Sequence, residues 1–317
     1  MTTIFSRPPG KFEHPTVTAS GEARAVVPLR RLETLWLNTG TVCNITCDNC
    51  YIQSGPHNDR LAYLSRTEAR RFLDEAARHR VTEIGFTGGE PFMNPEILDM
   101  VEDSLAAGFR VLVLTNAMRP MQRLETPLTA LNRRYPGQLT LRVSLDHYQA
   151  EAHERLRGQR TWQPAIDGLT WLVREGFTVA VAARMVWGLS DAVMRICFRE
   201  LFSILDLAID AQDPTQLVLF PEMRDDADVP EITERCWDIL GKSPDSVMCA
   251  SSRMVVKRKG AEHPVVLACT LIPYDEAFEL GATLSAASGP VALKHRHCAS
   301  FCVLGGASCN PHGDQTG

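Results

Sequence analysis

Residues 38–51 read NTGTVCNITCDNCY and follow directly on an apolar run. Their three cysteines, Cys43, Cys47 and Cys50, stand at C-x3-C-x2-C spacing, which places three thiols on one short loop. Structural zinc sites use four protein ligands, whereas three thiolates on a [4Fe-4S] cluster leave one iron open to another ligand. The loop therefore predicts a cluster with an open coordination position. Zinc with a fourth ligand elsewhere, such as His57, is the alternative.

A second motif, Thr87-Gly88-Gly89-Glu90-Pro91, follows the apolar run at residues 83–86. Residues without side chains let the backbone approach a cofactor closely, and a carboxylate accepts hydrogen bonds from an ammonium group. Alone, such a motif is an ordinary turn and helix start. After the cysteine loop, it predicts a binding site formed by Gly88, Gly89 and Glu90.

In this order, the two motifs resemble those of the radical S-adenosylmethionine (SAM) superfamily, over roughly residues 30 to 220. Where that family has an aromatic residue before the third cysteine, this chain has Asn49, with Tyr51 one place beyond the cysteine. The resemblance implies that SAM binds the open iron of the cluster and that Glu90 receives its ammonium group. It also implies an electron donor such as flavodoxin or ferredoxin.

Polar residues also interrupt the later apolar runs near their carboxyl ends, where barrel enzymes bind ligands. They include Asn116, Ser144 and Arg184. In similar enzymes a serine after the fourth strand and an arginine hold the SAM carboxylate or ribose. The resemblance therefore points to Ser144, and to Arg184 or Arg157, as cofactor-binding residues. A capped loop or a surface ion pair is the alternative for each.

The chain alternates apolar runs with helical patterns. The runs are residues 32–37, 83–86, 110–114, 140–145, 178–186 and 216–220. Between them, Ser65 and Glu68 form a capping-box pattern, and Asn94-Pro95 predicts the start of another helix. Six strands alternating with helices predict an α/β fold with a parallel sheet. Right-handed crossovers then curl the sheet into a partial (β/α)6 TIM-type barrel.

The organisation changes at both ends of the predicted barrel, which spans residues 32–224. Residues 1–31 contain several prolines and predict an arm lying across the barrel. Residues 225–317 predict a small α+β extension, with a short helix at residues 231–240 and a hairpin turn at residues 257–260.

Composition limits the function classes. A net charge of −5 and a pI near 6.0 argue against nonspecific nucleic-acid binding. No apolar run at the N-terminus is long enough for a signal peptide or a membrane span, so we expect a cytoplasmic protein without a membrane partner. In that compartment, ten cysteines are expected as metal ligands or core residues rather than disulfides.

Five of the cysteines gather near the C-terminus: Cys249, Cys269, Cys298, Cys302 and Cys309. Their placement around a predicted hairpin resembles the twitch or shortened SPASM extension of some radical SAM enzymes, which binds an auxiliary [4Fe-4S] cluster. Four thiolates suffice for one cluster. We expect the first four as ligands, with Cys309 as a substitute. Structural zinc is the alternative, with His263, His295 or His297 as possible ligands.

The sequence therefore predicts a radical SAM enzyme. The resemblance implies that SAM is cleaved reductively to methionine and a 5′-deoxyadenosyl radical, which abstracts hydrogen from a small-molecule or peptide substrate. Two alternatives remain open. One is a SAM-dependent methyl- or aminocarboxypropyl-transferase, and the other is a non-enzymatic, zinc-stabilised binding protein.

Overall fold

A computed structural model describes residues 10–223 and 227–307. Its main feature is one nine-stranded sheet in the order β10-β9-β8-β2-β3-β4-β5-β6-β7. The six predicted strands run parallel to one another in this sheet, from β2 to β7. These strands are β2 (Thr34–Asn38), β3 (Glu83–Thr87), β4 (Arg110–Thr115), β5 (Leu139–Ser144), β6 (Thr178–Met185) and β7 (Leu217–Pro221).

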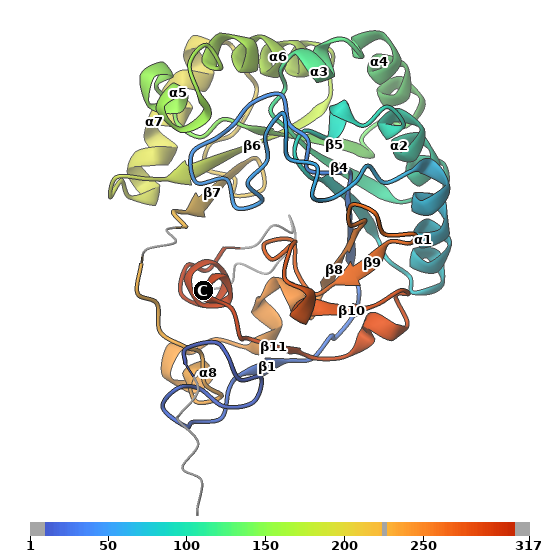
Figure 1. The fold of residues 1–317 in the computed structure, drawn as a ribbon. Coiled ribbons are helices and arrows are strands. Elements are labelled where there is room, and N and C mark those ends of the chain that lie inside the picture. The colour runs from blue at the N-terminus through green and yellow to red at the C-terminus, as the bar shows by residue number, and fades with distance from the viewer. Residues whose placement is uncertain (1–9, 224–226, 308–317) are drawn as a thin grey trace, which may run out of the picture.

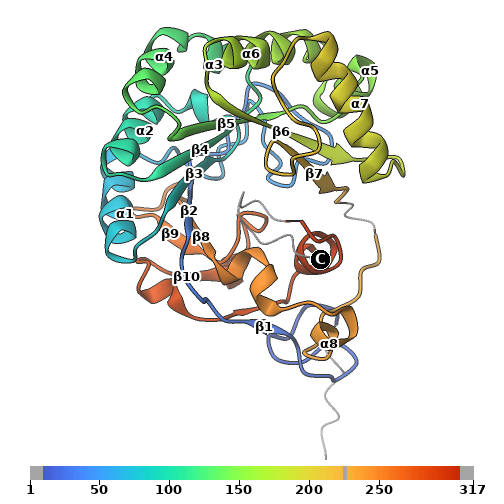
Figure 2. The same cartoon turned by 180° about the vertical axis from the view of Figure 1, so that it is seen from behind.

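The sheet curves, and all its helices except the short last one lie on the outer side, as both views show (Figures 1 and 2). The helices are α1 (Arg66–Arg78), α2 (Ile97–Ala106), α3 (Arg119–Gln122), α4 (Glu125–Arg134), α5 (Ala150–Arg157), α6 (Trp162–Arg174), α7 (Asp191–Ile204) and α8 (Cys236–Leu240). Every residue of β2 and β3 is buried, as expected for parallel strands covered on both faces. The predicted α/β fold with a partial barrel is confirmed.

Helix starts show where local sequence rules succeed and where they fail. The capping box before α1 is confirmed, since Ser65 accepts from the Glu68 N–H and the Glu68 carboxylate accepts from the Ser65 N–H. The predicted helix start at Asn94-Pro95 is wrong, because α2 begins at Ile97. The Asn94 side chain instead donates to two backbone carbonyls, those of Thr39 and Leu64.

The predicted hairpin around residues 257–260 is present, and it joins the main sheet. Its first strand, β8 (Ser252–Val256), pairs in parallel with β2, and β9 (Val265–Leu267) and β10 (Glu279–Gly281) continue antiparallel. The helix predicted at residues 231–240 is shorter, since α8 begins at Cys236. The domain limits at residues 31 and 224 stay a prediction.

The described part of the N-terminal arm, residues 10–31, lies along the C-terminal segments and not across the barrel. Its strand β1 (Val26–Val27) pairs antiparallel with β11 (Val291–Ala292). Figure 1 shows the loops of the arm beside α8. No helix in the described parts of the chain is long and apolar enough to cross a membrane.

Candidate active site

The cysteine loop follows β2 at the carboxyl end of the sheet, as predicted. Its backbone is anchored on two sides. The Cys43 N–H donates to the Gly55 carbonyl (3.1 Å), and the loop carbonyls of Gly40 and Val42 accept from the N–H groups of Gly89 (2.8 Å) and Glu90 (3.1 Å). The two sequence motifs are therefore in direct contact through their backbones.

Gly88 and Gly89 are required by this contact. A Cβ atom on Gly89 would overlap the Val42 carbonyl and lie 2.7 Å from the Thr41 oxygen. Gly88 has a φ of +141° and lies against the Gly40 carbonyl. We expected the glycines to admit a cofactor, and both do line the cavity beside the cysteines. The structure shows in addition that the absence of side chains at the two glycines leaves room for the backbone of the cysteine loop.

Glu90 is buried behind this cavity and does not line it. Its carboxylate accepts from the Thr115 hydroxyl (2.9 Å) and from the N–H groups of Asn116 (2.8 Å) and Phe92 (3.2 Å). Burial raises the pKa of Glu90 to about 7, while the hydrogen bonds from Asn116 and Thr115 act to lower it. In the structure this carboxylate orders the loop after β4.

Asn116, one of the predicted cofactor-binding residues, links that loop to the cysteines. Its side-chain amide donates to the Asn44 Oδ1 atom at 2.9 Å, and its own Oδ1 accepts from the Met118 N–H at 3.0 Å. The amide group is thus held at the edge of the cavity that Cys43 lines.

Arg184 and Arg157 share one buried carboxylate, that of Asp146. The Asp146 Oδ2 atom lies 2.6 Å from Arg184 Nη2 and 3.0 Å from Arg157 Nε. Burial alone would raise the pKa of Asp146, but the two guanidinium groups hold this pKa below its usual range. Because two arginines share one carboxylate, a net positive charge remains beside the cysteine loop.

The network of Asp146, Arg157 and Arg184 also holds the backbone of the cysteine loop at Asp48. Arg184 Nη1 donates to the Asp48 carbonyl (3.0 Å), and the Asp48 N–H donates to the Leu156 carbonyl at the end of α5 (2.7 Å). Sequence reasoning assigned Asp146 no role. The only available signal was its position just after β5, next to Ser144.

The thiols of the loop are partly withdrawn from water. Burial raises the pKa of Cys43 to about 12, and it also raises the pKa of Cys47, where the nearby Arg157 acts in the opposite direction. Metal clusters bind thiolates, so a positive group close to these sulfurs favours the binding form.

One cavity of about 190 Å³ brings most of the predicted residues together. From the predicted set it is lined by Cys43, Cys47, Cys50, Gly88, Gly89, Asn116, Ser144 and Arg184. Arg157 and Tyr51 also line it, and Phe301 and Leu271 close it from the C-terminal side. A larger space of about 490 Å³ adjoins it and shares Cys47, Cys50 and Leu271.

Four of the five C-terminal cysteines line a separate small cavity. They are Cys249, Cys269, Cys298 and Cys302, and Cys309 lies outside the described residues. Burial raises the pKa of Cys249 to about 11 and that of Cys298 to about 12.

Among the histidines considered as zinc ligands, His297 lines this cavity, and its ring packs at a tilt against that of His295, with 4.6 Å between the ring centroids. His57 and His263 are exposed. In residues 10–223 and 227–307 no three His, Cys, Asp or Glu side chains gather closely enough for a single metal ion.

Comparison with known proteins agrees with the geometry of the first site. Residues 37–191 match the family model described as the radical SAM superfamily. Mycofactocin maturase MftC of Mycobacterium tuberculosis is 28% identical over 135 residues, which is 43% of this chain and 33% of the relative. The subtilosin biosynthesis protein AlbA of Bacillus subtilis is 28% identical over 189 residues, 57% of this chain and 39% of the relative.

The chain thus spans only about a third of the length of these relatives. Two solved structures support the fold. SuiB of Streptococcus suis bound to S-adenosylmethionine has a TM-score of 0.57 at 14% identity, covering 80% of this chain and 63% of its own. Native anSMEcpe with bound AdoMet has a TM-score of 0.55 at 13% identity, covering 80% and 79%.

Proposed function

The chain carries a radical SAM domain, and from this we propose that it is an enzyme that cleaves SAM reductively and abstracts hydrogen from a substrate. The observation that carries the proposal is the single cavity in which three loop cysteines, two glycines and the polar ends of β4, β5 and β6 meet. When bound, a reduced cluster with SAM on its open iron supplies an electron to the sulfonium and so generates the 5′-deoxyadenosyl radical.

In this proposal Cys43, Cys47 and Cys50 hold the cluster, since all three line one cavity and come from one loop. The net positive charge of the Asp146, Arg157 and Arg184 network offsets the negative charge of the thiolates. The same network fixes the loop backbone at Asp48, so that the sulfurs are held in place before the cluster is inserted.

Ser144 and Asn116 are the proposed polar contacts for SAM, because both line the cavity from the ends of neighbouring strands. Arg184 is already bound to Asp146 and to the Asp48 carbonyl. We therefore assign Arg184 a positioning role in addition to any contact with the cofactor. Glu90 supports the site from behind by holding the Asn116 backbone.

Apolar residues line the C-terminal side of the cavity. Phe220 of β7 packs against Phe301 at 5.4 Å between ring centroids, and Leu271 lines the same space. An apolar wall at this side would help to hold the substrate in one orientation toward the radical.

A second [4Fe-4S] cluster is proposed at Cys249, Cys269, Cys298 and Cys302. The proposal is supported by the four thiols lining one cavity, since four thiolates suffice for one cluster. Structural zinc is the competing assignment, and the metal content of the purified protein distinguishes the two.

The proposed substrate is a peptide or a small molecule. Mycofactocin maturase and the subtilosin biosynthesis protein are similar over 43% and 57% of the chain, and a related fold occurs in SuiB bound to its precursor peptide SuiA. The adjoining space of about 490 Å³ is within the range that accommodates a small ligand or a few side chains.

The test is anaerobic reconstitution with iron and sulfide, followed by reduction with dithionite in the presence of SAM. We expect about eight irons per chain, and methionine with 5′-deoxyadenosine as products. The Cys47→Ala variant should lose about four irons and all cleavage. Methylthioadenosine in place of 5′-deoxyadenosine would support an aminocarboxypropyl-transferase, and zinc without iron would support the non-enzymatic binding protein.

A further inference from the structure

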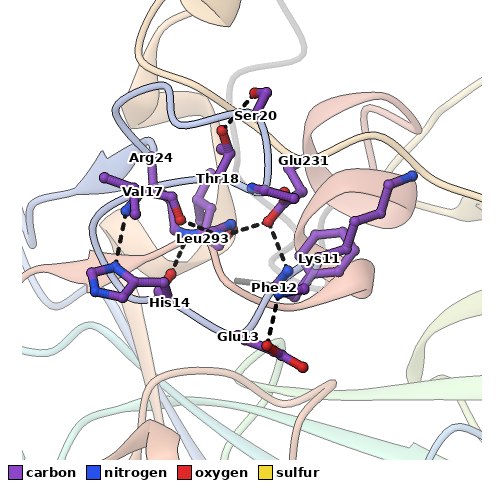
Figure 3. Close-up of polar contacts among 12 residues, drawn as sticks. Lys11, Phe12, Glu13, His14, Val17, Thr18, Ser20, Arg24, Glu231 and Leu293 are labelled. Carbon is purple, nitrogen blue, oxygen red and sulfur yellow. Dashed lines mark hydrogen bonds and ion pairs between the residues drawn. The ribbon is translucent and has the colours of Figure 1, made fainter. Parts of the chain in front are cut away.

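The N-terminal arm is attached to the C-terminal segments by one buried arginine. Arg24 is 1% exposed and donates to three backbone carbonyls: His14 (2.7 Å), Val17 (2.9 Å) and Leu293 (3.2 Å). Its fourth contact is an ion pair with Glu231 at 2.5 Å. Figure 3 shows Arg24 between the turns of the arm, with its guanidinium directed at Glu231.

Glu231 completes the connection from the other side. Its carboxylate accepts from the backbone N–H groups of Phe12 (2.7 Å) and Ala19 (2.6 Å), and its side chain is 7% exposed. Two turns of the arm are therefore organised around one ion pair that is closed to solvent. The predicted helix at residues 231–240 starts late because the backbone of its first residues pairs with the arm: the Ile232 carbonyl accepts from the Ala25 N–H, and the Glu234 N–H donates to the Ala23 carbonyl.

Beyond Arg24 the arm runs between the segments that carry the C-terminal cysteines. The Leu293 N–H donates to the Ala25 carbonyl (3.0 Å), and Val27 pairs with Val291. Further along, the Arg30 N–H donates to the Ala250 carbonyl (2.9 Å), next to Cys249. Val291 and Leu293 themselves line the cavity of the four cysteines.

We propose that the N-terminal arm is a clasp that assembles the C-terminal cysteine site, and that the Arg24–Glu231 pair closes it. Cys249 and Cys298 are 49 residues apart in the sequence, and the arm hydrogen-bonds to the segments before Cys298 and after Cys249. Arg253 adds a side-chain link, since it donates to the Cys249 and Gly289 carbonyls.

The first test uses thiol protection in the metal-free protein, so it does not depend on the proposed second cluster. Cys249 and Cys43 are similarly buried, at 7% and 5% exposure. The Arg24→Met variant leaves the buried Glu231 carboxylate without its ion-pair partner, which should make the arm detach more often. We therefore expect alkylation of Cys249 by iodoacetamide to accelerate by about a hundredfold. Alkylation of Cys43, in the first cysteine loop, should change by less than about threefold.

Arg235→Met is the matched control. Arg235 and Glu22 also join the arm to the segment before α8, but at 3.9 Å and largely exposed, so its loss should leave Cys249 protected. The double variant Arg24→Met/Glu231→Leu removes the stranded charge and should still expose Cys249 more than the control does, because the carbonyl contacts of Arg24 are lost. Unchanged Cys249 protection, or equal acceleration at Cys43, overturns the clasp.

The second test counts irons and rests on the proposed second cluster. Reconstituted Arg24→Met should hold about four irons per chain, against about eight in the wild type, and should still cleave SAM. If the wild type holds about four, the second cluster is wrong while the alkylation result stands. If both hold about eight, the arm is not needed for assembly and the clasp is wrong.

Discussion

Replacing Gly89 with alanine tests whether the two sequence motifs must touch. The new Cβ would lie 2.7 Å from the Thr41 oxygen and closer still to the Val42 carbonyl. Carbon–oxygen contacts require about 3.3 Å, so the nearer Val42 carbonyl, and the cysteine loop with it, has to retreat by about 1 Å. Overpacking of this kind costs about 1–3 kcal/mol, and it would be released by displacing the loop.

The readout is iron bound after anaerobic reconstitution, because iron content reports on the loop and not on SAM contacts. We expect Gly89→Ala to bind about four irons fewer than the wild type, with the remaining absorbance due to the C-terminal site. Gly289→Ala is the control, since Gly289 has a φ of −65° and no atom within 4 Å of an added Cβ. Full iron content in Gly89→Ala would refute the packing explanation.

Three further predictions concern charge and ligation. Asp146→Asn removes the carboxylate shared by two largely buried guanidinium groups and should lower the free energy of unfolding by about 3–5 kcal/mol in urea titrations. Asp191→Asn, whose side chain is 54% exposed in its pair with Arg195, should cost less than about 1 kcal/mol, and equal losses would contradict the network. Burial raises the pKa of Glu90 from 4.5 to about 7, so its folded form binds the proton more tightly. The free energy of unfolding of the metal-free protein should therefore fall by up to about 3 kcal/mol as the pH rises from 4.5 to about 7. Glu90→Gln should reduce this dependence on pH, and an unchanged dependence would mean that other groups cause it. Cys298→Ser should lower the iron count from about eight to about four, while Cys236→Ser leaves it at about eight, and an equal loss in both would exclude a specific ligand role.

The parallel strands could be predicted because each is a nearly continuous apolar run between helical patterns. The sequence did not indicate which strand pairs with β2 on the side away from β3. The pairing of β8 with β2 joins residues more than 200 positions apart, as at Thr34 and Ser252. Local patterns indicate that a segment is extended, but they carry no information about which distant strand it meets.

The site residues show the same limit. Cysteine spacing predicted that the three thiols meet at one cavity, because all three lie on one loop, where sequence distance bounds spatial distance. The shared carboxylate of Asp146 was missed because its partners, Arg157 and Arg184, come from two later elements. The glycine pair was recognised as a place of close approach, yet only the structure shows that the approaching group is the loop carbonyl of Val42.

The β2–β8 pairing also relates the two cysteine sets in space. Cys43 follows the carboxyl end of β2, whereas Cys249 precedes the amino end of β8, and the two strands run in parallel. Each strand has five residues and is therefore about 16 Å long. The adjoining cavity lies between the sets, since both Cys50 and His297 line it. Moving one set relative to the other would break the hydrogen bonds of β2 with β8. The sheet therefore sets the distance that an electron would cross between a substrate in this cavity and either proposed cluster.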